Sequence, residues 1–173
     1  MHGKVGIQLD KTTFINNILE SEQTLYRVSK SILGNDQDCE DAVNNAILKA
    51  YEKLDSLKEQ QYFKTWLIRI VINECNSLRR KQFNILPFEE ILNNKKVEEK
   101  DDYSDLYIAI QGLSKKIKIP IVLYYIEGYS IDEIKKILDI PQGTVKSRLS
   151  RGRKLLKTKL EDMEVKYEQR QVK

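Results

Sequence analysis

The sequence predicts an all-α fold made of two small helical domains joined by a flexible linker. Apolar residues recur at helical spacing, and strict alternation of apolar with polar residues is almost absent. Only seven glycines and three prolines interrupt the 173 residues. A charged stretch of low hydrophobicity separates two periodic blocks. The predicted parts are a first domain at 10–81, a linker at 82–102, a second domain at 103–162 and a C-terminal tail at 163–173.

Three helices are expected in the first domain. The first ends at Gly34, a typical position for a C-terminal cap. The second begins near Asp36 or Asp38, where acidic side chains suit the positive end of the helix dipole. The third, at 62–81, is apolar on nearly all sides in its first half, as expected of a helix surrounded by neighbours. One polar stripe nevertheless runs along it, formed by Arg69, Asn73, Asn76 and Arg80.

Aromatic and basic residues at the start of this third helix suggest a nucleic-acid surface. Tyr62, Phe63 and Trp66 precede and enter the helix, and a base unstacked from a duplex can lie against such rings. Tyr62 and Lys64 are expected to face solvent or the strand. Trp66 fits the core better than a stacking platform, because its neighbours are apolar.

The second domain closes with two short helices joined by a tight turn. Ser130 and Glu133 predict a capping box at the start of the first helix, and Pro141 blocks its continuation. The next helix resumes at Thr144 and is expected to pack closely through the small Gly152. Two such helices are typical of a helix-turn-helix, whose second member enters the DNA major groove. Upstream of this pair, Pro120 is expected to start or kink a helix.

The charge of the second helix supports DNA binding. Residues 142–160 carry seven Lys and Arg side chains and no acid, although the whole chain has a net charge of only +4. An ordinary solvated helix usually mixes both signs, so a solvated basic face is the weaker interpretation. The expected base-reading residues share one face and are Thr144, Ser147, Arg148 and Arg151. The expected phosphate contacts are Lys146, Arg153, Lys154 and Lys157.

Several other classes of function are excluded. Cys39 and Cys75 are expected to be free thiols in the core, and with His2 as the single histidine they cannot form a structural zinc site. No apolar run approaches the ~20 residues of a membrane span, and the N-terminus lacks a signal peptide, so a soluble cytoplasmic protein is expected. No phosphate-binding glycine loop or nucleophile motif occurs. We therefore expect no catalytic residue, cofactor, metal or small-molecule substrate.

In their order, several motifs resemble the bacterial sigma-70 family, in its extracytoplasmic function (ECF) class. They are 38–43, 63–70 with Asn73, Arg79 and Arg80, 127–130, 133–134, and 140–149. The resemblance covers about residues 25–160. It implies a helical bundle of the sigma region 2 type and a helix-turn-helix of the region 4 type, without the third region of larger sigma factors. It also implies a protein that binds core RNA polymerase, directs it to promoters and helps to open the minus-10 element.

The resemblance implies three surfaces by position. Core polymerase would dock on the helix at 38–54, with candidate contacts Asp38, Glu40, Asp41, Asn44, Asn45 and Leu48. The minus-10 element would meet Tyr62, Phe63, Lys64, Trp66, Arg69, Asn73, Asn76, Arg79 and Arg80. The minus-35 element would meet the helix at 142–157 through the base-reading and phosphate-binding residues named above. The implied partners are core polymerase, promoter DNA and an anti-sigma factor of a kind that is often membrane-bound; no obligate homo-oligomer is implied.

Two other functions stay open on the residues alone. A stand-alone helix-turn-helix repressor or activator would use its first domain for dimerisation or sensing, and its homodimer would bind two half-sites about one helical turn apart. A helical adaptor that never contacts DNA is the second alternative, but it does not explain why residues 142–160 are basic and lack acids. The sequence does not decide whether the tail extends the last helix.

Overall fold

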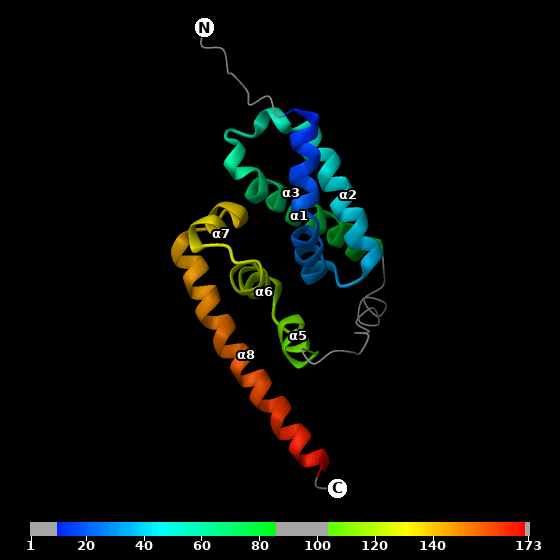
Figure 1. Ribbon diagram of the computed structural model, residues 1–173. Helices are drawn as coiled ribbons and strands as arrows, with labels where there is room; N and C mark the ends of the chain where they lie inside the picture. The colour runs from blue at the N-terminus through cyan, green and yellow to red at the C-terminus, as the bar shows by residue number, and fades with distance from the viewer. Residues whose placement is uncertain (1–9, 86–103, 172–173) are drawn as a thin grey trace. The chain divides into compact units, whose positions relative to one another are not determined.

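The structure is a computed structural model that describes residues 10–85 and 104–171, with side chains at 10–81 and 105–165 (Figure 1). Every regular element within these ranges is a helix. The chain divides into two compact units. The predicted fold class, two helical domains without a sheet, is therefore confirmed for the described residues.

The first unit consists of three long helices that contact one another in all pairs. They are α1 (Lys11–Leu33), α2 (Asp36–Glu52) and α3 (Phe63–Ile85), and two short 3-10 turns, η1 (Leu54–Ser56) and η2 (Gln60–Tyr62), lie between α2 and α3. Leu67, Ile68 and Val71 of α3 are fully buried. This burial confirms that the third helix is the central one, because its apolar first half is in contact with both neighbours.

Local sequence signals set most helix ends in this unit. Gly34 ends α1 with a φ of 89°, a left-handed conformation that costs glycine little. The prediction for the end of α3 is wrong, because the helix continues to Ile85 rather than ending at Lys81. No proline or glycine follows Lys81 until Pro87, so nothing in the sequence breaks the helix earlier. The first residues of the expected linker are therefore helical, and the rest of it, 86–102, lies outside the described residues.

The second unit holds several short helices and one long helix. They are α5 (Ser104–Gln111), α6 (Lys115–Ile121), a π-helical turn η3 (Val122–Ile126), α7 (Ile131–Leu138) and α8 (Gln142–Gln171). Helix α8 contacts both α5 and α6. Its 30 residues span about 45 Å. The helix includes residues 163–171, so the tail extends it instead of fraying.

Pro120 lies inside α6 and not at its start. The helix has already begun at Lys115, so one of the two predicted outcomes for this proline, a helix start, is wrong. Directly after the proline the backbone widens into η3, where the N–H of Glu127 donates to the carbonyl oxygen of Val122 at 3.0 Å. Such a five-residue hydrogen bond is the mark of a π turn, a feature that often accompanies functional sites.

None of the helices in the two described ranges combines the length and the apolar character that a membrane span requires.

Candidate nucleic-acid interface

Helices α7 and α8 form the predicted helix-turn-helix. The capping box at its start is present, because the N–H of Glu133 donates to Ser130 Oγ at 3.2 Å and the N–H of Ser130 donates to Glu133 Oε2 at 2.8 Å. Asp139, with a φ of 54°, ends α7 in the left-handed conformation. Across the turn, the side-chain amide of Gln142 donates to Asp132 Oδ1 at 3.1 Å. This side-chain hydrogen bond therefore ties the start of α8 to the first turn of α7.

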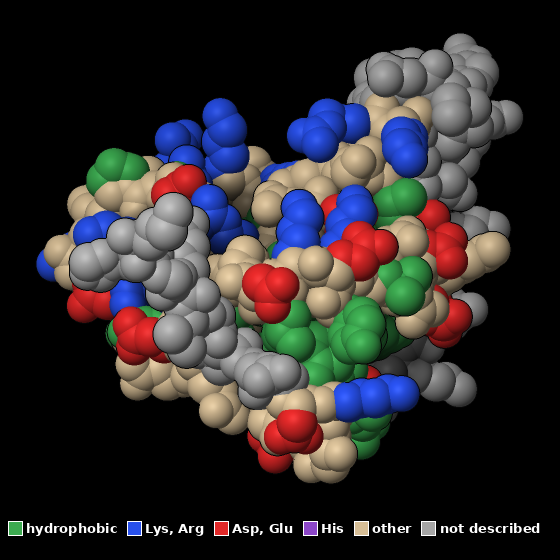
Figure 2. Space-filling view, turned by 90° about the horizontal axis from the view of Figure 1, so that it is seen from above, with side chains coloured by type: hydrophobic (Ala, Val, Ile, Leu, Met, Phe, Trp, Pro, Cys, Tyr) green, Lys and Arg blue, Asp and Glu red, His purple; other side chains and the backbone are tan. Residues whose placement is uncertain are grey.

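The packing of α8 decides which of its side chains face solvent. Val145, Leu149 and Gly152 form its buried face, and Gly152 packs directly against Ile121 of α6. The opposite side carries the predicted DNA contacts. Those that lie exposed are Lys146, Ser147, Arg151, Arg153, Lys154 and Lys157, while Thr144 and Arg148 are half-buried. Basic side chains stand at the surface in the space-filling view (Figure 2).

Two cations of α8 have polar partners within the unit, and a third packs against its backbone. Arg153 Nη1 donates at 3.0 Å to the hydroxyl of Tyr125, a residue that sequence reasoning did not select as a site residue. Lys157 Nζ lies 3.8 Å from Glu161 Oε1, an exposed pair of low energy. Lys159 packs against Gly112, which follows α5. If Gly112 carried a side chain, its Cβ would lie 2.9 Å from Lys159 Nζ. The basic run therefore divides into cations that face solvent and one, Lys159, that packs against its own domain.

The start of α3 places its aromatic rings differently from the expectation. Phe63 is only 3% exposed and meets Phe14 edge-on with ring centroids 5.6 Å apart, so its assignment as a minus-10 contact is wrong. It belongs to the core because α1 packs over it. Trp66 is half-buried beside Phe63, with ring centroids 5.8 Å apart. Tyr62 is 38% exposed, so it is the ring of the three that a base can reach most readily.

The polar stripe of α3 lies where the helical spacing predicts it, and its members Arg69, Asn73 and Arg80 are exposed. Lys64 and Arg79, two other expected minus-10 contacts, are exposed as well. Asn76 is half-buried. The stripe thus forms a polar and basic edge that begins at Tyr62, and it agrees with a surface for an unpaired strand.

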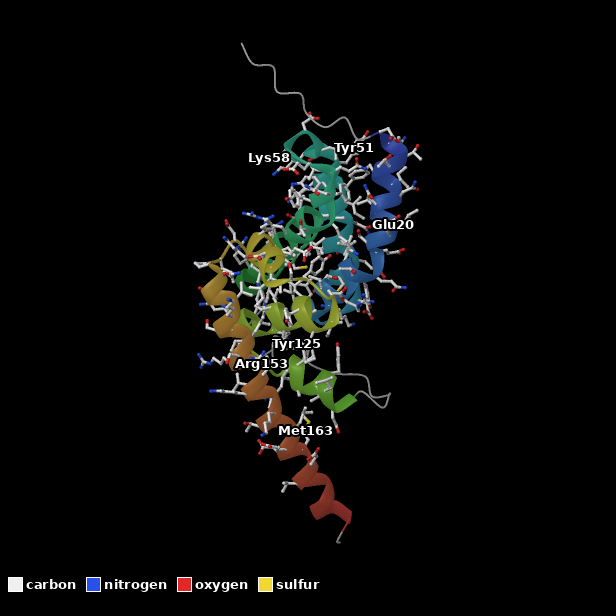
Figure 3. The ribbon with its side chains drawn as sticks, turned by 60° about the vertical axis from the view of Figure 1, so that its left-hand side comes forward. Glu20, Tyr51, Lys58, Tyr125, Arg153 and Met163 are labelled. Carbon is white, nitrogen blue, oxygen red and sulfur yellow. The ribbon has the colours of Figure 1, made fainter. Side chains whose placement is uncertain are left out.

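The α2 face holds most of the implied polymerase contacts at the surface. Glu40, Asp41, Asn44, Asn45 and Leu48 are exposed, and Leu48 is 63% exposed. Tyr51, which sequence reasoning did not select, follows Leu48 by three residues and is 57% exposed (Figure 3). Its ring lies edge-on to Phe14, with centroids 5.5 Å apart. An exposed leucine and an exposed tyrosine one turn apart are suited to a protein partner.

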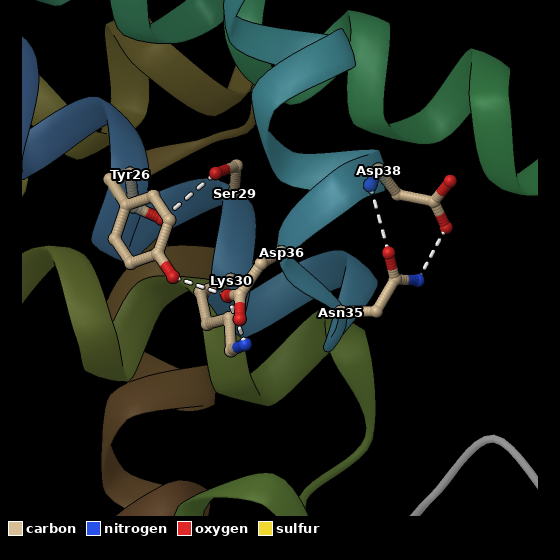
Figure 4. Close-up of polar contacts among 6 residues, drawn as sticks. All are labelled: Tyr26, Ser29, Lys30, Asn35, Asp36 and Asp38. Atoms are coloured by element: carbon tan, nitrogen blue, oxygen red, sulfur yellow. Dashed lines mark hydrogen bonds and ion pairs between the residues drawn. The ribbon is translucent and has the colours of Figure 1, made fainter.

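Asp38, by contrast, has a structural role. Its N–H donates to the side-chain oxygen of the N-cap residue Asn35 at 2.8 Å, and Asn35 Nδ2 donates back to Asp38 Oδ2 at 2.5 Å (Figure 4). One carboxylate oxygen of Asp38 is thus already engaged. Asp38 therefore supports the cap of α2, and its role as a polymerase contact stays a prediction.

The neighbouring Asp36 ties the end of α1 to the start of α2. Its Oδ1 accepts hydrogen bonds from the hydroxyl of Tyr26 and, at 2.5 Å, from Lys30 Nζ (Figure 4). Both hydrogen bonds hold the pKa of Asp36 below its ordinary value, and the one from Lys30 has the larger effect. The pKa of Tyr26 is raised, chiefly because its hydroxyl donates to this carboxylate. The angle at which α2 leaves α1 is therefore set by charge as well as by the glycine turn.

The two cysteines match their prediction. Cys39 and Cys75 are buried, free thiols. Burial raises the pKa of the Cys39 thiol, which keeps it protonated and unreactive. Within the described ranges, no group of three or more His, Cys, Asp and Glu side chains could hold a metal ion.

Comparison with known families assigns both units. The family model for sigma-70 region 2 matches residues 18–83, and the model for sigma-70 region 4 matches residues 104–156. The chain belongs to the sigma-70 family. The region 2 match spans most of α1, α2 and α3, and the region 4 match spans α5 through the first half of α8. The second half of α8 extends beyond the sigma-70 match.

Relatives of this sigma-70 chain carry the ECF name, which confirms the resemblance. It is 29% identical over 172 residues to the ECF RNA polymerase sigma factor SigW of Bacillus subtilis (strain 168), covering 89% of this chain and 92% of that relative. It is 28% identical over 144 residues to the ECF RNA polymerase sigma-E factor of Escherichia coli (strain K12), covering 73% and 75%.

Two solved structures share the fold of the sigma-70 chain. The sigma factor RpoE in complex with the anti-sigma factor NepR from Bartonella quintana superposes with a TM-score of 0.71 at 27% identity, covering 86% of this chain and 96% of that one. CnrH in complex with the cytosolic domain of CnrY superposes with a TM-score of 0.68 at 21% identity, covering 88% and 90%.

Proposed function

We propose that this chain is an RNA polymerase sigma factor that directs core polymerase to specific promoters and helps to open them. One observation carries the proposal: an acid-free basic stretch, residues 142–160, stands at the start of the second helix of a helix-turn-helix, in a chain that also contains sigma-70 region 2. Region 2 is the part that a stand-alone helix-turn-helix repressor would not need. The polymerase performs the chemistry, and the chain itself requires no ATP or other cofactor.

The recognition helix α8 positions the complex on the minus-35 element. Ser147, Arg148 and Arg151 lie on the face directed to base edges, while Lys146 and Lys154 are placed for phosphates. Phosphate contacts supply affinity without sequence information, and base contacts supply the preference. The helix therefore carries more cations than contacts to bases alone would require, because some of them bind phosphates.

The α3 edge captures the opened minus-10 element. Tyr62 offers an exposed ring, and the basic and amide side chains that follow it line one stripe. Because these groups bind unstacked bases and not the closed duplex, they shift the equilibrium toward the open form. Each unit alone binds DNA weakly, and mounting both on polymerase makes the second contact effectively intramolecular.

Polymerase docking falls to the exposed α2 face around Leu48. An anti-sigma factor would mask the same surfaces, and the complex of the related RpoE with NepR supports such a partner for this chain. The proposed place of action is the cytoplasm, where polymerase and promoters are found. Attachment to a membrane would come only through an anchored anti-sigma factor.

Run-off transcription tests the proposal. Purified core polymerase is supplied with genomic fragments from the organism of origin, with and without the chain. Transcripts that start at defined promoters only in the presence of the chain are the expected result. Tight duplex binding by the chain alone, with no effect on transcription, would instead support the stand-alone repressor. Absence of both activities would support a helical adaptor.

A further inference from the structure

The hydroxyl of Tyr125 is held at the surface by the guanidinium of Arg153. Tyr125 lies in η3, the turn that follows α6, and Arg153 lies in α8; Nη1 of Arg153 donates to Tyr125 Oη at 3.0 Å (Figure 3). Tyr125 is 49% exposed and Arg153 is exposed as well. The hydrogen bond therefore joins two elements of the domain where solvent and ligands can reach both groups.

The direction of this hydrogen bond leaves donors available. Tyr125 Oη accepts from Arg153, so its own proton is free to bind a further acceptor. A guanidinium has five N–H donors, and this bond uses one of them. Among the described residues, no carboxylate pairs with Arg153. The pair thus presents an O–H donor and charged N–H donors side by side, without a counterion.

Packing fixes the pair in place. The ring of Tyr124 meets that of Tyr125 edge-on, with centroids 4.9 Å apart and planes at 77°. Gly152, next to Arg153, packs against Ile121 at the end of α6. The two donors are therefore preorganised, and a ligand gains their hydrogen bonds without ordering them first.

Two further cations lie on the same side of α8. Lys146 precedes Arg153 by seven residues and Lys157 follows it by four, a spacing that places the three along one helical face. Both lysines are exposed. A row of cations suits a polyanion better than a single carboxylate, and DNA is the polyanion that the proposed function brings to this helix.

We propose that Tyr125 and Arg153 together bind one phosphate of the DNA backbone, which makes Tyr125 a DNA contact that lies outside the recognition helix. The proposal rests on the proposed function, because promoter binding by α8 brings the backbone to this edge. Arg153 supplies charge and Tyr125 supplies the neutral O–H. Hydrogen bonds to charged oxygens are shorter and stronger than those between neutral groups. The contact positions the domain and does not read sequence.

The test uses the full chain, alone at low salt and reconstituted with core polymerase. Fluorescence anisotropy measures its affinity for a labelled duplex of arbitrary sequence. Tyr125→Phe removes the hydroxyl and keeps the ring, and it should weaken binding about tenfold. Tyr124→Phe is the matched control, because that neighbouring hydroxyl forms no hydrogen bond with a described residue; its affinity should equal that of the wild type. Equal affinity of Tyr125→Phe and wild type overturns the proposal, as does a wild type that binds DNA in neither form.

A double-mutant cycle tests whether the two residues share one ligand. Arg153→Gln should weaken binding and lower the slope of log affinity against log salt by about one. Tyr125→Phe should leave that slope unchanged, and it should add little to the loss in the Arg153→Gln background. Additive losses in the double variant would contradict a shared phosphate.

Duplexes with a single neutral methylphosphonate separate contact from mere support of the fold. At one backbone position, neutralising the phosphate should weaken the wild type but not Tyr125→Phe. If no position shows this difference, the tyrosine only supports the domain and the proposal fails.

The outcomes also separate this inference from the proposed function. Promoter-specific transcription by the wild type supports the sigma function whatever Tyr125 does. Unchanged duplex affinity of Tyr125→Phe then refutes the phosphate site alone. A Tyr125 effect on core polymerase binding, with duplex affinity intact, would assign the pair to a protein partner and overturn the inference. If Tyr125→Phe weakens duplex binding but the wild type supports no transcription, the phosphate site is supported and the sigma function is refuted; the chain would then be a DNA-binding protein of another kind.

Discussion

Ile121 of α6 fills the space in which Gly152 of α8 would carry a side chain. A Cβ on Gly152 would lie 2.6 Å from Ile121 Cδ1 and 2.7 Å from its Cγ1, and 3.0 Å from Ile117 Cγ2. Isoleucine is stiff at its first torsion, so it cannot simply rotate away. The glycine therefore sets how closely the recognition helix packs on the domain, and with it how far the basic face stands from the core.

Gly152→Ala should destabilise the second unit. The added methyl forces α8 away from α6, at a cost of about 1–3 kcal/mol, against a gain of about 1 kcal/mol in helix propensity. Chemical denaturation of the full chain measures the change. Gly143→Ala is the matched control, because Gly143 lies in the same helix with open space around its Cβ position; it should be neutral or slightly stabilising. A Gly152→Ala variant as stable as Gly143→Ala would contradict the close packing.

Arg148→Ala should change promoter choice, because its side chain lies on the face assigned to bases. The expected loss is on the order of 1–3 kcal/mol at promoters that share one minus-35 base, and little elsewhere. Run-off transcription across a series of minus-35 variants measures the preference. Lys154→Ala serves as comparison and should weaken all promoters alike while making binding less salt-dependent. An unchanged preference in Arg148→Ala would remove this residue as a base reader.

The hydrogen bonds from Lys30 and Tyr26 to Asp36 should make a pH-dependent contribution to stability. Lys30 and Tyr26 lower the pKa of Asp36 in the folded chain from its ordinary value of 3.8. A lowered folded pKa means that the ionised form is favoured by folding, so the contribution is present above pH 3.8 and is lost as the pH falls through the lowered value. Asp36→Asn should therefore be less stable than the wild type at neutral pH.

Urea denaturation of both proteins across the acid range measures this difference. The two free energies of unfolding should converge as the pH drops, because protonation removes the same charge that the substitution removes. Tyr26→Phe deletes one of the two donors and should lose part of the same contribution. A gap between wild type and Asp36→Asn that stays constant with pH would refute a role for the charge.

The capping box at Ser130 follows from local residue types, whose geometry is similar in most proteins. The small size of Gly152 predicted close packing there, but the sequence did not show that Ile121 of α6 is the neighbour. The burial of Phe63 does not follow from local residue types, because an aromatic residue at a helix start can turn to a base or to the core with equal propensity. The hydrogen bond between Tyr125 and Arg153 joins two residues that are 28 positions apart and lie in different helical elements. The basic charge of the sequence predicted Arg153 as a phosphate contact, but it did not indicate that Tyr125 is the hydrogen-bond partner of Arg153.

Tyr62 and Phe63 are adjacent in sequence and should fail in different ways when changed. Phe63 is 3% exposed, so Phe63→Ala should cost about 3–5 kcal/mol of stability and lower promoter use only through unfolding. Tyr62 is 38% exposed, so Tyr62→Ala should leave the free energy of unfolding nearly unchanged. Without the Tyr62 ring, the open complex loses one base stack, about 1–3 kcal/mol.

Permanganate reactivity of unpaired thymines in the minus-10 element measures that loss directly. In complexes of core polymerase with the Tyr62→Ala chain, reactivity should fall while polymerase binding to the closed promoter is retained. Tyr62→Phe keeps the ring and should open promoters like the wild type, since stacking needs the face of the ring and not its hydroxyl. If Tyr62→Ala opened promoters as fully as the wild type, the exposed ring would have no part in capturing bases, and the half-buried Trp66 would be the next ring to test.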